Sequence, residues 1–192
     1  KPSVPAKTPQ ELIAYAKAHP NKLNFGFPTG TLPHLTGELF KQRAGVDVQF
    51  IPYKGAAQAL TDVISGTVEL YMSSVPTLIG QIRNNKLRPL AVTSAKRVDD
   101  LPNVPTINES GYTGFDAVTW FGLLAPAGTP KDVITRLNAE FNKALQNADL
   151  RKALGDQGAD AAGGTPEQFA AVIRDDIPRW GKVVKDSGAK VD

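Results

Sequence analysis

Short apolar runs alternate with amphipathic stretches over the first half of this sequence, and that alternation constrains the fold most. The apolar runs, which are typical of β-strands, lie at 23–27, 46–52, 68–72 and 87–93. The stretches with helical spacing lie at 32–43, 56–65 and 75–84. Strand–turn–helix units of about 25 residues imply parallel pairing with right-handed crossovers. The sequence therefore predicts an α/β fold with a sheet rich in parallel strands.

Helices are also expected at both ends of the chain. Thr8 can cap a helix in which Glu11 supplies the acid of a capping box, and Pro20 stops that helix. Prolines and glycines between 94 and 114 mark a long connection, and the apolar stretch after it could cross between two lobes. Three more helices are predicted, the last kinked by Pro178, at 131–147, 148–157 and 166–187.

Composition excludes several classes of protein. Lys and Arg number 22 against 19 Asp and Glu, a net charge of +3 that is too balanced for a nucleic-acid binder. The absence of cysteine excludes disulfides, thiolate catalysis and cysteine-based zinc sites, and two histidines leave little for another metal. We therefore expect no cofactor and no metal. No apolar run has the length of a membrane span, and no signal peptide follows Lys1, so we expect a mature or truncated fragment.

Three predicted turns follow strands and precede helices, the place where α/β sheets bind ligands. The side chains and backbone groups they offer belong to Thr29, Gly30, Thr31 and nearby His34, to Tyr53, Lys54, Gly55 and Ala56, and to Ser73 and Ser74. Helix N-termini gathered in this way present free N–H groups, which favour an anion. We expect these turns to converge on one crevice.

The turns contain no Asp or Glu, so they lack the base of a hydrolase and the carboxylates of a hard-metal site. No phosphate-binding or nucleophile-elbow motif is present. This pattern indicates a binding protein rather than an enzyme. An enzyme that uses His34 or Lys54 is the alternative hypothesis. Purely structural roles stay open for each residue: a turn for Gly30, a core or capping position for His34, packing for Tyr53, a solvated charge for Lys54 and caps for the two serines.

Six segments in the same order resemble one family across essentially the whole chain. They are GTLPHLTGELF at 30–40, PYKG at 52–55, LAVTSAKR at 90–97, LPNVPT at 101–106, WFGLLAPAGTP at 120–130 and GGTPEQF at 163–169. The sequence resembles the Bug (Bordetella uptake gene) family, the TctC-like periplasmic solute receptors of tripartite tricarboxylate transporters.

The resemblance implies a type II periplasmic binding protein fold that closes around a small organic carboxylate, a di- or tricarboxylate or an aromatic acid. It implies delivery to the membrane permease, without catalysis, and a periplasmic location. Residues 7–115 would form a near-complete second lobe, and residues 116–192 the mostly helical C-terminal part of the first lobe. The turn at 29–31 would match the carboxylate clamp, and the turns at 53–56 and 73–74 would flank it. A sensory module reporting the same ligand to a signalling partner is the alternative.

Three departures from the family pattern carry consequences. Members extend further at the N-terminus, so apolar faces including Val133, Leu137 and Phe141 would be exposed; we expect self-association or repacking, and weak ligand binding. The stretch 25–34 is about one residue shorter than usual, which would narrow the pocket or aim Thr29 differently. The serines at 73 and 74 stand where an acid is frequent, which argues against amino acids as ligands.

Overall fold

The chain falls into two units. The computed structural model describes residues 1–189 of the 192. Unit 1 contains Lys1–Thr119 together with Val183–Asp192, and unit 2 contains Trp120–Lys182. The two units differ in how their side chains are packed.

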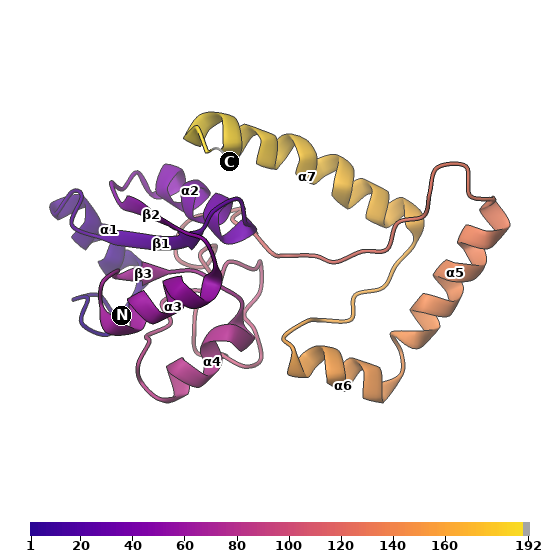
Figure 1. Cartoon of the computed structure of the whole chain (residues 1–192), viewed down its shortest axis with the longest axis horizontal. Coiled ribbons are helices and arrows are strands. Elements are labelled where there is room, and N and C mark those ends of the chain that lie inside the picture. Colours follow the sequence, from indigo (N-terminus) through magenta and orange to yellow (C-terminus); the bar gives the residue numbers. More distant parts are fainter. Residues whose placement is uncertain (190–192) are drawn as a thin grey trace. The chain divides into compact units, whose positions relative to one another are not determined.

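Unit 1 is built on a parallel sheet. Its strands are β1 (Asn24–Pro28), β2 (Gln49–Tyr53) and β3 (Leu70–Tyr71), in the order β2-β1-β3. Both pairings are parallel, so the predicted α/β fold is confirmed (Figure 1). The register places Phe25 of β1 between Phe50 and Leu70, which aligns the carboxyl ends of the three strands at the same edge.

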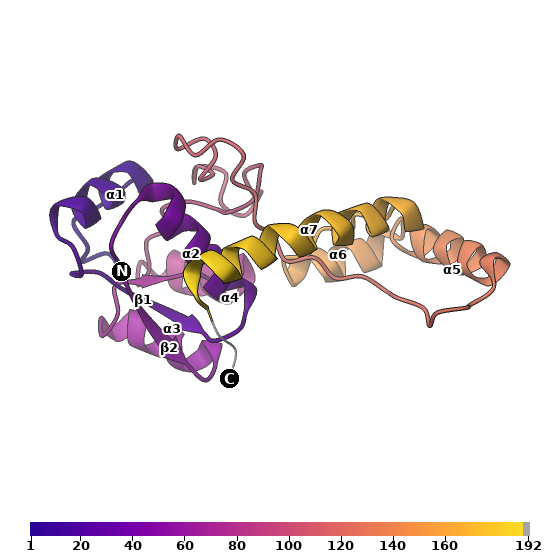
Figure 2. The ribbon, with the colours of Figure 1, turned by 90° about the horizontal axis from the view of Figure 1, so that it is seen from above.

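Helices cover both faces of this sheet (Figures 1 and 2). Helices α1 (Pro9–Ala18) and α2 (Leu32–Ala44) pack with Phe25 and Phe27 in one buried cluster. Helices α3 (Ala56–Ser65) and α4 (Val75–Arg83) contribute to a second cluster with Tyr53, Val63 and Val68. Because successive side chains of a strand point to opposite faces, this alternation along β1 and β2 gives unit 1 two cores.

The first helix begins as its sequence predicts. Thr8 Oγ1 accepts a hydrogen bond from the Glu11 N–H at 3.1 Å. The Glu11 carboxylate in turn accepts one from the Lys7 N–H at 2.6 Å. Two N–H groups at the start of α1 are thereby satisfied, and the helix ends at Ala18, two residues before Pro20.

The prediction of a strand at 87–93 is wrong. Only one parallel bridge, Val92 with Thr106, forms in that stretch. Leu87 is buried in one core cluster and Leu90 packs against the other, so the apolar pattern reflects burial without ladder pairing. Pro89, which has no N–H to donate, stands in the middle of the stretch. The other predicted strands and helices are observed with shifts of a few residues at their ends, and the helix at 56–65 has the predicted bounds.

Unit 2 holds helices without a core. Helix α5 spans Lys131–Ala144, α6 spans Ala148–Asp156, and α7 spans Pro166–Ser187. All residues of unit 2 are described, and none is buried. Its internal links are mainly polar: the Asn142 amide donates to Gly164 O at 2.9 Å and accepts from Gly164 N at 2.8 Å.

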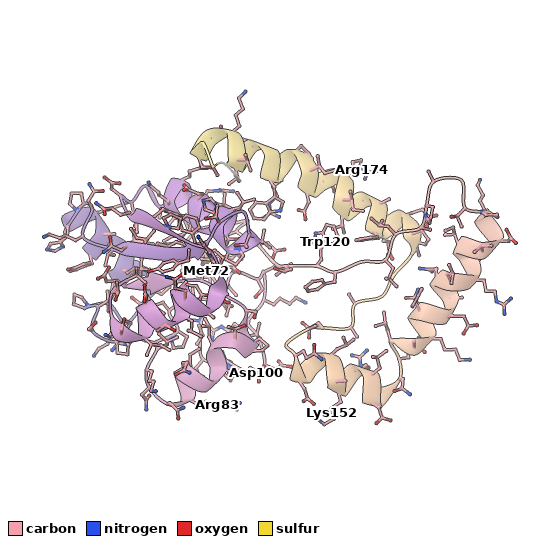
Figure 3. The ribbon with its side chains drawn as sticks, in the orientation of Figure 1. Met72, Arg83, Asp100, Trp120, Lys152 and Arg174 are labelled. Atoms are coloured by element: carbon pink, nitrogen blue, oxygen red, sulfur yellow. The ribbon has the colours of Figure 1, made fainter. Side chains whose placement is uncertain are left out.

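The indole of Trp120 links the start of unit 2 to α7 (Figure 3). Its Nε1–H donates to Asp176 Oδ2 at 2.8 Å, and its ring meets Phe169 edge-on with centroids 5.1 Å apart. Among the helices of residues 1–189, none combines the length and the apolar character that crossing a bilayer requires.

Candidate functional site

The three predicted turns meet at one edge of the sheet. Pro28 at the end of β1 is paired in register with Tyr53 at the end of β2, and Gly26 is paired with Tyr71 of β3. The Thr29 N–H donates to Tyr53 O at 3.3 Å, which ties the first turn to the second. The three turns therefore lie at the same edge of the sheet, and their convergence on a ligand crevice stays a prediction.

The turn from Thr29 to Thr31 leads into α2. Gly30 has a φ of +72°, in the left-handed region that glycine tolerates best. Thr31 is the N-cap residue, but its hydroxyl donates to Pro28 O at 2.7 Å and does not cap the helix. Within the described residues, nothing accepts a hydrogen bond from the N–H groups of Gly30, Thr31 and Leu32.

The second turn is exposed and equally open. Gly55 is the N-cap of α3 and has no side chain to offer, while Lys54 and Ala56 lie at the surface. The Tyr71 hydroxyl donates to Ala56 O at 3.2 Å, which ties the end of β3 to this turn. Within the described residues, nothing accepts a hydrogen bond from the N–H groups of Gly55 and Ala56.

The third turn joins β3 to α4. Met72, labelled in Figure 3, packs against the core cluster of α1 and α2, and leaves Ser73 and Ser74 at the edge. Ser74 is the N-cap residue of α4, yet its hydroxyl pairs with that of Thr77 at 2.8 Å. No side-chain oxygen therefore caps the backbone N–H groups of this helix.

The first turns of these three helices differ from those of the other described helices. An acidic residue occupies the first turn of α1, α5, α6 and α7, namely Glu11, Asp132, Asp149 and Glu167. The first turns of α2, α3 and α4 contain none. A carboxylate at a helix N-terminus offsets the positive end of the helix dipole. The sheet edge therefore keeps the positive potential of three helix starts, and this arrangement attracts an anion.

Tyr53 lies in the core rather than at the rim. Its side chain is 8% exposed, and its hydroxyl donates to Asp62 Oδ2 of α3 at 2.7 Å. Burial, together with the hydrogen bond to Asp62 and its negative charge, raises the pKa of Tyr53 to about 12. The phenol is thus neutral and already paired, so Tyr53 contributes to the edge through its main chain.

His34 is also turned inward. It is 5% exposed and stacks on Phe27 with ring centroids 4.1 Å apart. Burial lowers the pKa of His34, so the ring is neutral near pH 7, and no described residue hydrogen-bonds to its buried Nδ1. The imidazole thus packs in the core below the first turn of α2, which agrees with the core position that the sequence analysis gave as an alternative for His34.

Two supporting residues escaped the sequence analysis. Asp62 accepts from the Tyr53 hydroxyl, and its carbonyl accepts from the N–H groups of Gly66, Thr67 and Val68. Tyr71 holds the second turn through Ala56. The available signal was a tyrosine at the end of each of the two outer strands, β2 and β3. In the described part of the chain, no cluster of three or more His, Asp or Glu is placed to hold a metal ion.

A parallel sheet edge with open helix starts and no acidic group in its turns is the arrangement of an α/β solute-binding protein. A family model described as "Tripartite tricarboxylate transporter family receptor" matches residues 1–189, and the chain belongs to this family. The family consists of periplasmic receptors rather than enzymes, in agreement with the expectation of binding without catalysis.

Relatives support this assignment over nearly the whole chain. Protein BugT of Bordetella pertussis is 40% identical over 181 residues, which are 94% of this chain and 56% of BugT. The structure titled "R. palustris Rpa4515 with adipate" has a TM-score of 0.82 at 37% identity and covers 97% of this chain and 62% of that one. "MatC (Rpa3494) from Rhodopseudomonas palustris with bound malate" has a TM-score of 0.73 at 29% identity, over 94% of this chain and 63% of that one. The chain thus spans 56–63% of the length of these relatives.

Proposed function

We propose that this chain is the ligand-holding part of a periplasmic receptor that takes a small organic carboxylate, a di- or tricarboxylate or an aromatic acid. The receptor delivers its ligand to the permease of a tripartite tricarboxylate transporter. Family membership supports the receptor role, and two relatives of solved structure hold the dicarboxylates adipate and malate.

The observation that carries the proposal is the convergence of three helix starts without acids or side-chain caps at one sheet edge. The ligand carboxylate accepts hydrogen bonds from the backbone N–H groups of Gly30, Thr31, Gly55, Ala56 and Ser74 and from the hydroxyls of Thr29 and Ser73. A hydrogen bond to a charged group stabilises by about 1.5–3 kcal/mol, so two or three of them suffice to select a carboxylate. His34 and Tyr53 hold the turns from beneath.

The same turns favour a carboxylate without an amino group. Binding an ammonium group out of water requires a carboxylate or several carbonyls directed at it. The three turns contain no Asp or Glu, so they offer an ammonium group no carboxylate partner. We therefore expect dicarboxylates to bind better than amino acids of equal length.

A titration followed by NMR of backbone amides tests the site directly in the full chain. Adipate or malate should shift the amide signals at the starts of α2, α3 and α4 and leave those at the starts of α1 and α6 unmoved. Helices α1 and α6 serve as internal controls, since Thr8 and Asn147 cap them and each has an acid in its first turn. The uncharged diamide of adipate should produce no shifts. Equal shifts at all helix starts, or none at any dicarboxylate concentration, would remove the edge as the site.

Replacement of Thr31 by valine tests the first turn. The substitution removes the hydroxyl that donates to Pro28 O and loosens the turn, so carboxylate binding should weaken by about 1–2 kcal/mol. Thr113→Val is the matched control, because Thr113 is exposed and belongs to none of the three turns. If the two variants bind adipate equally well, Thr31 does not belong to the clamp.

A further inference from the structure

Lys54 is the only residue with a permanent charge in the three turns of the proposed site. Its side chain is exposed, and across the described part of the chain no residue forms a hydrogen bond or an ion pair with its ammonium group. The acids nearest to it along the chain have other partners. Asp47 accepts from the Asn21 amide at 3.1 Å, and Asp62 accepts from the Tyr53 hydroxyl at 2.7 Å. Lys54 therefore brings an unpaired positive charge to the second turn.

The register of the sheet places this charge beside the first turn. Pro28 at the end of β1 is paired with Tyr53 at the end of β2, and Lys54 is the next residue. The Thr29 N–H donates to Tyr53 O at 3.3 Å, so the two main chains are still about one strand spacing apart, roughly 4.8 Å, where the strands end. A lysine ammonium group moves on a flexible stem of four carbons. It is therefore within reach of a ligand held at the start of α2.

A diacid needs a partner for each of its two carboxylates. The N–H groups at a helix start are fixed donors, and they bind one carboxylate at a set position. The second carboxylate lies at a distance that depends on the length of the ligand, so its partner must be able to move. Lys54 meets this requirement, whereas His34 does not, because burial lowers the pKa of His34 and leaves its ring neutral near pH 7.

We propose that Lys54 binds the second carboxylate of a diacid and makes the site selective for dianions over monoanions of the same length. This inference rests on the proposed function, which supplies the contact to the first carboxylate. It chooses between the ligand classes named there, and favours di- and tricarboxylates over aromatic monoacids. Adipate and malate, the diacids held by two relatives of solved structure, differ in length. A flexible cation opposite a fixed set of N–H groups accepts diacids of different length without a change in the fold.

Titrations of the full chain with adipate and with its monoamide, followed by NMR of backbone amides, test the selectivity. The monoamide has the same length and keeps one carboxylate, so the unmodified chain should bind it about tenfold more weakly than adipate. Lys54→Gln should weaken adipate binding by about tenfold and leave the affinity for the monoamide unchanged. Lys22→Gln is the matched control, because Lys22 is exposed and precedes β1 at the opposite edge of the sheet. It should change neither affinity by more than about twofold.

The outcomes separate this inference from the proposed function. If the unmodified chain binds neither compound, both proposals are overturned. If adipate and the monoamide bind equally well at the helix starts, or if Lys54→Gln weakens the binding of both by the same factor, the carboxylate site stands and the inference about Lys54 is overturned. Lys54 would then be a solvated surface charge.

A charge reversal at the same position should exchange the preference. Lys54→Glu should bind adipate more weakly than Lys54→Gln does, because like charges then meet. It should gain affinity for 6-aminohexanoate, which also has six carbons and carries an ammonium group in place of the second carboxylate. Because the Lys54 side chain is exposed, both variants should keep the circular dichroism of the unmodified chain. If Lys54→Glu still binds adipate better than 6-aminohexanoate, the proposal is overturned.

Discussion

Unit 1 buries apolar side chains on both faces of its sheet, whereas unit 2 buries none. Phe115 in unit 1 is 2% exposed, and Phe141 on α5 of unit 2 is 47% exposed. The helices of unit 2 nevertheless have amphipathic spacing and acidic first turns like those of α1. The difference shows that local sequence specifies a helix and its apolar face, while the partner for that face must come from elsewhere.

The aromatic residues allow the two units to be followed separately. All four tyrosines precede residue 120 and lie in unit 1, and both tryptophans, Trp120 and Trp180, lie in unit 2. Near-ultraviolet signals of tyrosine therefore report on unit 1, and tryptophan fluorescence reports on unit 2. Transitions that do not coincide for the two probes would show that the units unfold independently.

The largest effect is expected from removing a buried ring of unit 1. Phe115→Ala should lower the free energy of unfolding by about 3–5 kcal/mol, because it removes apolar burial and leaves a cavity. Phe141→Ala makes the same chemical change at a half-exposed site and should cost less than about 1 kcal/mol. Denaturant titration measures Phe115→Ala with the tyrosine signal and Phe141→Ala with tryptophan fluorescence, because the two residues lie in different units. Equal losses would mean that Phe141 is packed in solution, as it would be if another chain covered α5.

A smaller effect is expected from adding a methyl group. A Cβ at Gly37 of α2 would lie 2.7 Å from the Phe25 ring, so Gly37→Ala should destabilise unit 1 by about 1–3 kcal/mol. A Cβ at Gly181 of α7 meets nothing within 4 Å, so Gly181→Ala should stabilise its helix by roughly 0.5–1 kcal/mol. Thermal unfolding, read with tyrosine for the first variant and with far-ultraviolet dichroism for the second, checks both signs. A stabilising Gly37→Ala would contradict the packing of α2 on β1.

The smallest effect is confined to alkaline solution. Burial beside Asp62 raises the pKa of Tyr53 from 10.0 to about 12, so the folded chain holds the phenolic proton more tightly than the unfolded chain. The stabilisation from this group is complete below pH 10 and is lost as the pH rises to about 12. Tyr53→Phe should cost about 1 kcal/mol at neutral pH and remove this part of the alkaline decline. If wild type and variant lose stability in parallel from pH 10 upward, Tyr53 is not shielded as described.

Much of unit 1 follows from the sequence, because capping, glycine and apolar spacing act over short distances. Thr8 and Glu11 placed the start of α1, and the bounds of α3 were predicted to the residue. The stretch at 87–93 was misassigned because Leu87 and Leu90 are buried by two different core clusters, and burial alone does not reveal ladder pairing.

For the candidate site, the placement of the turns was predicted better than the orientation of the side chains. Backbone groups at strand ends converge wherever parallel strands are in register, so the positions of Gly30, Gly55 and Ser74 follow from topology. An aromatic side chain with a polar tip can turn either to the rim or to the core, and sequence does not distinguish the two. The Tyr53 hydroxyl donates a hydrogen bond to Asp62, which holds the phenol ring in the core. The His34 ring stays in the core because it stacks on Phe27.

In the proposed site, the anion is attracted by main-chain groups at the sheet edge. This origin affects how the ligand preference of such a receptor can change between relatives. Peptide dipoles persist whatever side chains surround them, so substitutions around the turns can reshape the proposed site without abolishing its attraction for an anion. Ligand choice can therefore drift while the basic chemistry of capture is inherited unchanged. Relatives that are 37% and 29% identical to this chain and hold a six-carbon and a four-carbon diacid are what such drift would produce.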